Sequence, residues 1–127
     1  MQTARQRRGA AGEELAAGYL AELGWRVISR NLKVGRDEID LLCVDPGPPA
    51  TLVSVEVRSL RTDAFGAPEE RVDRRKVGRL YRSLGALASL SELDPRVSRL
   101  PRRVDLVVVD RRFGQTHIRH LRALEPP

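Results

Sequence analysis

The 127-residue chain is short of cysteines, aromatic residues and long apolar runs. Its single cysteine, Cys43, excludes an internal disulfide and any zinc site built from several cysteines. Aromatic side chains make up 4% of the residues, so we expect an aliphatic core. No apolar run approaches the roughly 20 residues of a membrane-spanning helix, and the basic residues 1–11 lack the apolar stretch of a signal peptide. We therefore expect a cytoplasmic protein with no membrane partner.

What the chain does contain is the composition of one globular domain spanning residues 1–127. Hydrophobic residues make up 41% of the chain and charged residues 31%, close to the average for soluble domains. A chain of this length fits one domain and can bury a core without covalent cross-links. Residues 1–8 are polar and basic, which predicts a flexible N-terminal segment.

Basic residues outnumber acidic ones. The chain has 23 Lys and Arg against 17 Asp and Glu, which gives a formal net charge of +6, and Lys33 and Lys76 are its only lysines. Such a surplus favours polyanionic partners through long-range attraction and counterion release, and arginine binds phosphate in a bidentate manner. The surplus can also be incidental, because an arginine excess can reflect genome composition. Charge alone therefore makes nucleic acid a candidate partner and no more.

The hydrophobic periodicity predicts a helix, three strands, a second helix, a strand and a short last strand. The expected ranges are a helix at 9–23, strands at 25–30, 38–44 and 51–58, a helix at 73–90, and strands at 104–109 and 116–121. The first three strands can form an antiparallel meander, and the second helix then acts as a right-handed crossover that places strand 104–109 parallel to strand 51–58. The fold class is α/β, with a mixed sheet flanked by helices.

Two acidic residues are expected to face each other across the hairpin formed by strands 38–44 and 51–58. Because side chains alternate between faces, Ile39, Leu41 and Cys43 should share one face, and Asp40 should share the other with Glu56. Asp40 and Glu56 should lie opposite each other within about one residue, with Cβ atoms roughly 5 Å apart. Two carboxylates that close repel unless a cation or a proton lies between them.

Glu13 can add a third acidic group. It precedes the apolar residues of the first helix by three to seven positions, which turns it toward the packed side. If this helix covers the face that carries Asp40 and Glu56, three carboxylates converge, and such oxygen ligands suit Mg²⁺ or Mn²⁺. The alternative is that Asp40 and Glu56 are solvated strand residues and that Glu13 is a charge favoured at a helix start.

A series of different short motifs follows a specific order along most of the chain. They are Gly9-Ala-Ala-Gly12-Glu13, Tyr19-Leu20, Gly24-Trp25, Arg30-Asn31, Glu38-Ile39-Asp40-Leu41, Val55-Glu56-Val57-Arg58, Phe65-Gly66, Lys76 and Arg103-Val104-Asp105. With these motifs the chain resembles, from about Arg8 to Leu121, the YraN-like proteins. These are small bacterial proteins of the restriction-endonuclease-like superfamily and are similar to Holliday-junction resolvases.

The resemblance implies a restriction-endonuclease-like mixed β-sheet and a metal-dependent endonuclease acting on DNA phosphodiester bonds, with branched or repair intermediates as candidate substrates. It implies that Mg²⁺ or Mn²⁺ is held by Glu13, Asp40, Glu56 and the backbone carbonyl of Val57. Glu38 is implied as a secondary ligand. A junction-cutting role would also favour a homodimer.

Arg58 departs from the family pattern, which has a lysine two residues after the glutamate. Arginine stays charged at any working pH and cannot act as a general base. It can still stabilise charge on a phosphate, or simply neutralise Glu56. The family also tends to carry a basic residue at the position of Leu60, where only the neighbouring Arg61 remains. The change affects the expectation of turnover more than the expectation of nucleic-acid binding.

A cluster of basic residues begins the second helix and is a candidate for nucleic-acid binding. Arg74, Arg75 and Lys76 there oppose the helix macrodipole, and a bound phosphate would remove that penalty. The alternative is a solvated turn paired with Asp73 or with the acidic residues at 69–70. The nucleic-acid contacts expected together are Arg58, Arg61, Arg74, Arg75 and Lys76.

Other kinds of site find no support in the sequence. His117 and His120 are three residues apart on the last strand and do not suggest a metal pair, and we identify no Ser-His-Asp arrangement, P-loop or dinucleotide motif. Three hypotheses remain: a nuclease with Asp40, Glu56 and Arg58 as its catalytic residues, a non-catalytic nucleic-acid-binding protein with a degenerate site, and an interaction protein whose basic surface is incidental.

Overall fold

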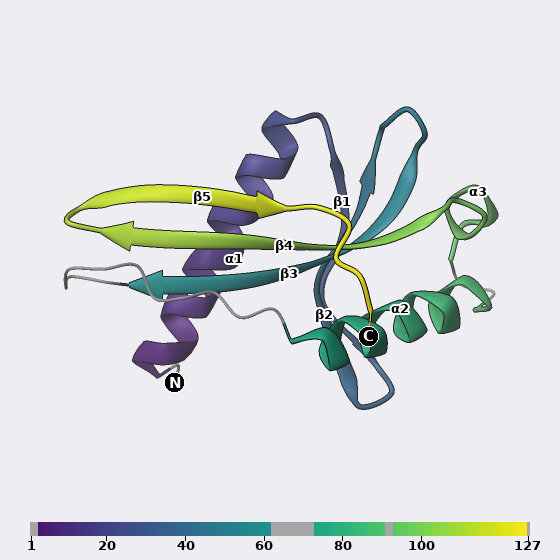
Figure 1. Ribbon diagram of the computed structural model, residues 1–127, viewed down its shortest axis with the longest axis horizontal. Helices are drawn as coiled ribbons and strands as arrows, with labels where there is room; N and C mark the ends of the chain where they lie inside the picture. The colour runs from purple at the N-terminus through teal and green to yellow at the C-terminus, as the bar shows by residue number, and fades with distance from the viewer. Residues whose placement is uncertain (1–2, 62–72, 91–92, 127) are drawn as a thin grey trace.

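The computed structural model describes residues 3–61, 73–90 and 93–126 (Figure 1). Its elements are α1 (Ala4–Glu22), β1 (Arg26–Val34), β2 (Asp37–Asp45), β3 (Thr51–Arg61), α2 (Arg74–Ala88), α3 (Pro95–Ser98), β4 (Arg102–Arg112) and β5 (Gln115–Leu121). The expected order of helices and strands is confirmed, and the short α3 lies in a stretch expected to be loop. None of the helices in this part of the chain is long and apolar enough to cross a membrane.

The five strands form one sheet in the order β1-β2-β3-β4-β5. β1, β2 and β3 are antiparallel neighbours, β4 runs parallel to β3, and β5 returns antiparallel to β4. The expected meander and the crossover through α2 are therefore confirmed. β4 is buried from Val104 to Asp110, as expected for a strand covered on both faces.

The first helix starts five residues earlier than its apolar pattern suggested, at Ala4 instead of Gly9. Thr3 and Gln6 form a capping box, in which each side chain accepts a hydrogen bond from the backbone N–H of the other residue. This polar signal carries no hydrophobic periodicity. At the other end, Gly24 has a φ of 86° and turns the chain into β1.

The sheet separates two hydrophobic clusters, one under each long helix. Ala16, Leu20 and Trp25 at α1 pack on one face, and Val77, Leu80 and Leu84 of α2 pack on the other. The strand residues on the α1 face are Leu41, Cys43, Val53, Val55, Val107 and Val109, and those on the α2 face are Ile39, Leu42, Leu52 and Val104. In Figure 1, α1 passes behind β3, β4 and β5.

The alternation of side chains in β2 breaks at Asp40, contrary to expectation. Ile39 belongs to the α2 cluster, whereas Leu41 and Cys43 belong to the α1 cluster. The pairing of β2 with β3 runs from Asp45 only as far as Leu41, while β2 stays paired with β1 to Asp37. Asn31, across from Asp40 in that β1 register, has a φ of 51°, a left-handed conformation that asparagine tolerates. β2 thus parts from β3 at Asp40, and the sheet forks there.

Candidate metal and phosphate site

Asp40 occupies the fork between β2 and β3. Beyond the last strand pair, Leu41 with Val55, the Asp40 carboxylate takes the place of a backbone partner. Its Oδ2 accepts a hydrogen bond from the backbone N–H of Val57 at 2.9 Å. Continuing the register by one residue sets Asp40 beside Glu56, as the hairpin geometry predicted.

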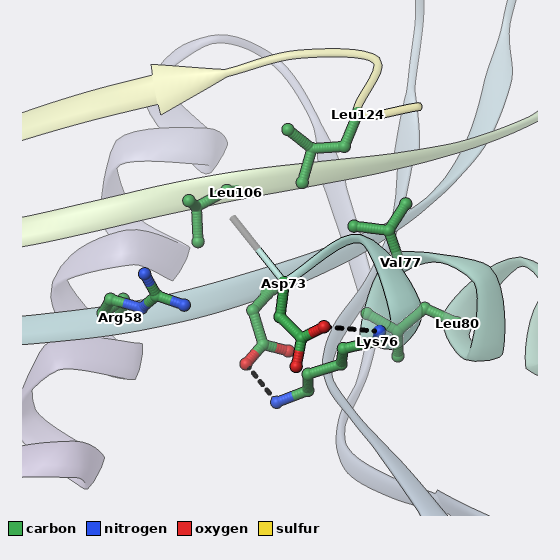
Figure 2. A pocket seen from close by; sticks show the side chains of 8 residues that line it. Arg58, Asp73, Lys76, Val77, Leu80, Leu106 and Leu124 are labelled. Carbon is green, nitrogen blue, oxygen red and sulfur yellow. Dashed lines mark hydrogen bonds and ion pairs between the residues drawn. The ribbon is translucent and has the colours of Figure 1, made fainter. Parts of the chain in front are cut away.

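Glu56 turns to the α2 face and lines a pocket there. Lys76 from the first turn of α2 donates to its Oε1 at 2.6 Å, and the Glu56 side chain is only 15% exposed. The second oxygen, Oε2, is buried and has no hydrogen-bond partner among the residues that the structure describes. Figure 2 shows Lys76 reaching across this pocket from α2, with Arg58 pointing into it from β3 and Leu106 and Leu124 at its wall.

The pKa of Asp40 is raised from 3.8 to about 7. Burial is the largest cause, followed by the charge of Glu56, while the hydrogen bond from Val57 lowers the pKa. The charge of Glu13 raises it further and the charge of Lys76 lowers it. A carboxylate pair with one elevated pKa and one buried, unpartnered oxygen is suited to hold a divalent cation.

Glu13 lies on α1, which packs on the opposite face of the sheet from the pocket that Glu56 lines, so the condition for three converging carboxylates, that α1 covers the face of Glu56, is not met. Gly12 lets α1 come close to β3, because a Cβ at that position would lie 2.8 Å from the Cβ and Oγ of Ser59. The negative charge of Glu13 is near enough to raise the pKa of Asp40. Within residues 3–61, 73–90 and 93–126, however, no three or more acidic, histidine or cysteine side chains form a metal-binding group. The structure therefore pairs Asp40 with Glu56 and leaves Glu13 at the far side of the fork.

Glu38, which the resemblance implies as a secondary ligand, does not line the pocket of Glu56. It is exposed and sits across from Lys33 in the β1–β2 hairpin. Its neighbour Asp37 contacts α2 instead, through an ion pair with Arg79 at 3.2 Å.

The basic residues expected to bind nucleic acid divide into three groups. Arg58 lines the pocket beside Glu56, as its strand position predicted. Arg74 and Arg75 are exposed on the first turn of α2. The backbone of Arg61 ends β3, and its side chain lies outside the described part of the structure.

The start of α2 differs from expectation in two ways. Asp73 is the N-cap of the helix, and its Oδ1 accepts hydrogen bonds from the backbone N–H groups of Arg75 and Lys76 at 3.0 and 3.3 Å. These two amides already donate hydrogen bonds to a carboxylate and are therefore not open for a phosphate. Lys76 pairs with Glu56, a partner that was not anticipated, and the acidic residues 69–70 lie outside the described residues.

A second buried polar network lies on the α1 face and was missed by the sequence reasoning. Asp105, fully buried, accepts from Arg103 and from His120 Nε2 at 2.8 Å, and His120 Nδ1 lies 3.0 Å from the Tyr19 hydroxyl. Arg103 also donates to Asp45 at 2.9 Å. An aspartate within the otherwise apolar run of β4 was the available signal, but the rest of the network comes from α1, β2 and β5 as well as from β4 itself.

The pKa of Asp105 is lowered despite its burial. Burial alone would raise this pKa, but hydrogen bonds from His120, Arg103 and the backbone N–H of Ala123 outweigh it. Because the Asp105 carboxylate can only accept, His120 carries its proton on Nε2, and in the neutral ring Nδ1 accepts from Tyr19. The network thereby joins α1, β4 and the end of β5.

The sequence matches the family model of the uncharacterised protein family UPF0102 over residues 12–109. The chain belongs to family UPF0102. A UPF0102 protein from Arthrobacter sp. (strain FB24) is 41% identical over 118 residues, which are 91% of this chain and 93% of that protein. UPF0102 proteins from Syntrophomonas wolfei and Bacteroides thetaiotaomicron are 35% and 34% identical, over 87% and 94% of this chain and 90% and 93% of their own lengths.

Among solved structures, this UPF0102 chain is similar to SfsA of Pyrococcus furiosus in complex with Ca²⁺. The TM-score is 0.37 at 19% identity, over 97% of this chain and 65% of that chain. This likeness is too weak to bear on fold or function. The residues matched to the family include Glu13, Asp40, Glu56, Lys76 and Asp105.

Proposed function

We propose that this UPF0102 protein is a Mg²⁺- or Mn²⁺-dependent endonuclease acting on DNA. The observation that carries the proposal is the pair at the fork: Asp40, whose pKa is raised to about 7, beside Glu56, whose buried Oε2 has no partner in the described part of the chain. Carboxylates held in this state gain most from a divalent cation, which relieves their repulsion and completes the coordination of the free oxygen.

The proposed cation ligands are Asp40, Glu56 and the backbone carbonyl of Val57. When bound, the ion would supply Lewis acidity to a phosphate oxygen and lower the pKa of a water molecule. Val57 N–H holds the Asp40 carboxylate in place, and Glu13 adds negative charge from the α1 side. Glu38, exposed on the hairpin, has at most an indirect part.

The proposed topology is that of the restriction-endonuclease-like proteins. Its support is an antiparallel meander followed by a helix and a parallel strand, with one acid at the fork and a Glu-Val-Arg strand beside it. The helix that carries Glu13, α1, precedes these strands in the chain and packs on the face of the sheet opposite α2. These features match the motif order on which the resemblance rests.

DNA is the proposed substrate because the chain is basic and the arginines gather near the pocket. The formal net charge is +6, Arg58 lines the pocket, and Arg74 and Arg75 are exposed next to it. Arginine in these places suits the phosphate backbone. A preference for branched or repair intermediates and a homodimer follow from the resemblance, the cytoplasm as the location follows from the sequence pattern, and all three remain predictions.

A second candidate is a nucleic-acid-binding protein without turnover. The observation that favours it is Arg58, which stands where the motif has a lysine and cannot exchange a proton. The two candidates share the binding surface and differ only in the reaction.

Cleavage of labelled duplex, flap and four-way-junction DNA in Mn²⁺ tests the proposal. We expect cleavage that is lost on chelation and reduced at least 100-fold by Asp40→Asn and by Glu56→Gln, while Glu22→Gln at the exposed end of α1 leaves it unchanged. Salt-sensitive DNA binding without cleavage would support the second candidate. Absence of binding even at low salt would leave an interaction protein with an incidental basic surface.

A further inference from the structure

Lys76 stands out because it brings a lysine to the site from an unexpected element. The strand motif supplies Arg58 where a lysine was expected, and the chain has only one other lysine, Lys33. Lys33 is exposed on the β1–β2 hairpin, away from the pocket. Lys76, twenty residues after Glu56, lies with its Nζ 2.6 Å from the Glu56 carboxylate.

The first turn of α2 holds Lys76 in this position. Asp73 accepts the backbone N–H of Lys76, and the next residue, Val77, is buried against the sheet together with Leu80. The backbone of the lysine is thus anchored from both sides, while its side chain stays 43% exposed. A flexible four-carbon stem on a fixed backbone lets the ammonium reach both Glu56 and the solvent side of the pocket.

The ammonium and a divalent cation would compete for the negative charge of one carboxylate, with Lys76 on Oε1 and the cation drawn to Oε2. They carry charge of the same sign, and the low local dielectric of a carboxylate that is 15% exposed strengthens their repulsion. A cation binding between Asp40 and Glu56 would weaken the ion pair of Lys76. Asp73 and Arg58 line the same pocket, and an anion that enters from solvent beside Arg58 would be a further partner for the ammonium.

We propose that Lys76 is the phosphate-contacting lysine of the site, supplied by α2 in place of a strand lysine. This inference rests on the proposed nuclease function. Without a divalent cation Lys76 neutralises Glu56, and when the cation binds it turns to a non-bridging oxygen of the DNA phosphate. In hydrolysis the water oxygen bonds to phosphorus, the bond to the departing sugar oxygen breaks, and that oxygen takes up the proton lost by water. Lys76 donates hydrogen bonds throughout and neither gains nor loses a proton.

The proposal predicts effects of opposite sign on two ligands. Removing the Lys76 charge removes a competitor for Glu56, so Lys76→Met should bind Mn²⁺ alone about 3- to 10-fold more tightly than the wild type, by isothermal titration. The same variant should bind junction DNA in Ca²⁺ more weakly, with the salt slope reduced by about 1. Its cleavage in saturating Mn²⁺ should fall about 100-fold. Lys76→Arg should keep the DNA contact and much of the competition.

Lys33→Met is the matched control, since it removes the same charge from the exposed hairpin. It should leave Mn²⁺ affinity and cleavage as in the wild type, and circular dichroism should show that each variant is folded. If Lys76→Met does not fold, Lys76→Gln takes its place in the same measurements.

Unchanged or weaker Mn²⁺ binding in the folded variant would overturn the proposal and would make Lys76 a structural partner of Glu56. If Lys76→Met cleaves DNA as fast as the wild type does, the proposal for Lys76 is also overturned, but the nuclease function still stands. If the wild type neither binds Mn²⁺ nor cleaves DNA, the proposed function fails, and the role of Lys76 fails with it.

Discussion

The backbone N–H of Val57 holds the side chain of Asp40 at the point where β2 leaves β3, at an N···O distance of 2.9 Å. A carboxylate there replaces the strand partner that β2 no longer provides. Glu56 lies next to Val57 in the chain and turns to the α2 face, so the fork brings two acids together from adjacent strands. The sheet tolerates this because one backbone hydrogen bond is kept and because Lys76 balances one of the charges.

The raised pKa of Asp40 predicts that Asp40→Asn stabilises the metal-free protein. In the wild type, the folded state must ionise a buried carboxyl that ionises freely when unfolded. The stability associated with this group is fully present below pH 3.8 and is lost as pH rises through about 7. Asp40→Asn keeps an acceptor for Val57 and should gain about 2–4 kcal/mol over the wild type above pH 7, with no gain near pH 4.

Urea unfolding of both proteins between pH 4 and pH 9, in the presence of a chelator, measures this difference. A saturating concentration of Mn²⁺ should reverse it, because only the carboxylate gains a strong ligand interaction. A stability difference that does not change with pH would show that Asp40 is ionised in the folded protein throughout this range.

The same pKa predicts that Mn²⁺ binding releases a proton. Below pH 7 most Asp40 carboxyls are protonated and must lose that proton to bind the cation, so affinity should rise about tenfold per pH unit there and level off above pH 7. Isothermal titration at pH 6 in buffers of different ionisation enthalpy should give close to one proton per cation. The release should vanish in Asp40→Asn, and a wild-type value near zero at pH 6 would contradict the assignment.

Local patterns predicted the pairing of the two acids but not the surroundings of each. Strand alternation and the length of the hairpin loop were enough to set Asp40 beside Glu56. The fork coincides with Asn31, whose left-handed backbone belongs to the neighbouring strand and leaves no hydrophobic period. Strand alternation alone therefore assigns Ile39 and Leu41 to one face, and it does not determine which face α1 covers.

Contacts between distant elements were beyond such reasoning for a related cause. Lys76 reaches Glu56 only because α2 docks at one particular height on the sheet, and helix periodicity gives the buried face without that height. The pairing of His120 with Asp105 likewise depends on the register between β4 and β5, in which Val107 faces His120. Periodicity within one element predicts which side chains are buried, and packing between elements decides which polar groups meet.

The close approach of α1 to β3 at Gly12 predicts that a larger residue there destabilises the protein and that a smaller residue at Ser59 restores the stability. Gly12→Ala would place a methyl group 2.8 Å from the Cβ and Oγ of Ser59, so the helix must shift away from the strand. We expect a loss of about 1–3 kcal/mol in the free energy of unfolding. Mn²⁺ affinity should also change, because Glu13 moves with the helix. Ser59→Gly in the same chain removes both clashing atoms and should restore stability and affinity, whereas Gly18→Ala, where nothing lies within 4 Å, should cost nothing. A double variant as unstable as Gly12→Ala alone would rule out this contact as the cause.

The network around Asp105 predicts a site that matters for folding and not for the metal. Its lowered pKa means that the stability it contributes is present above pH 3.8 and is lost as pH falls through the lower pKa of the folded state. Asp105→Asn leaves Arg103 partly unpaired in a buried place and should cost roughly 3–5 kcal/mol at pH 7, with the cost shrinking toward pH 3.

Tyr19→Phe removes only the hydrogen bond to His120 and should cost about 1 kcal/mol. Urea unfolding measures both, and Mn²⁺ titration of the folded Tyr19→Phe protein should match the wild type, because Asp105 and His120 lie on the α1 face while Glu56 and its pocket lie on the α2 face. A change of Mn²⁺ affinity in that variant would mean that the two networks are coupled through the sheet.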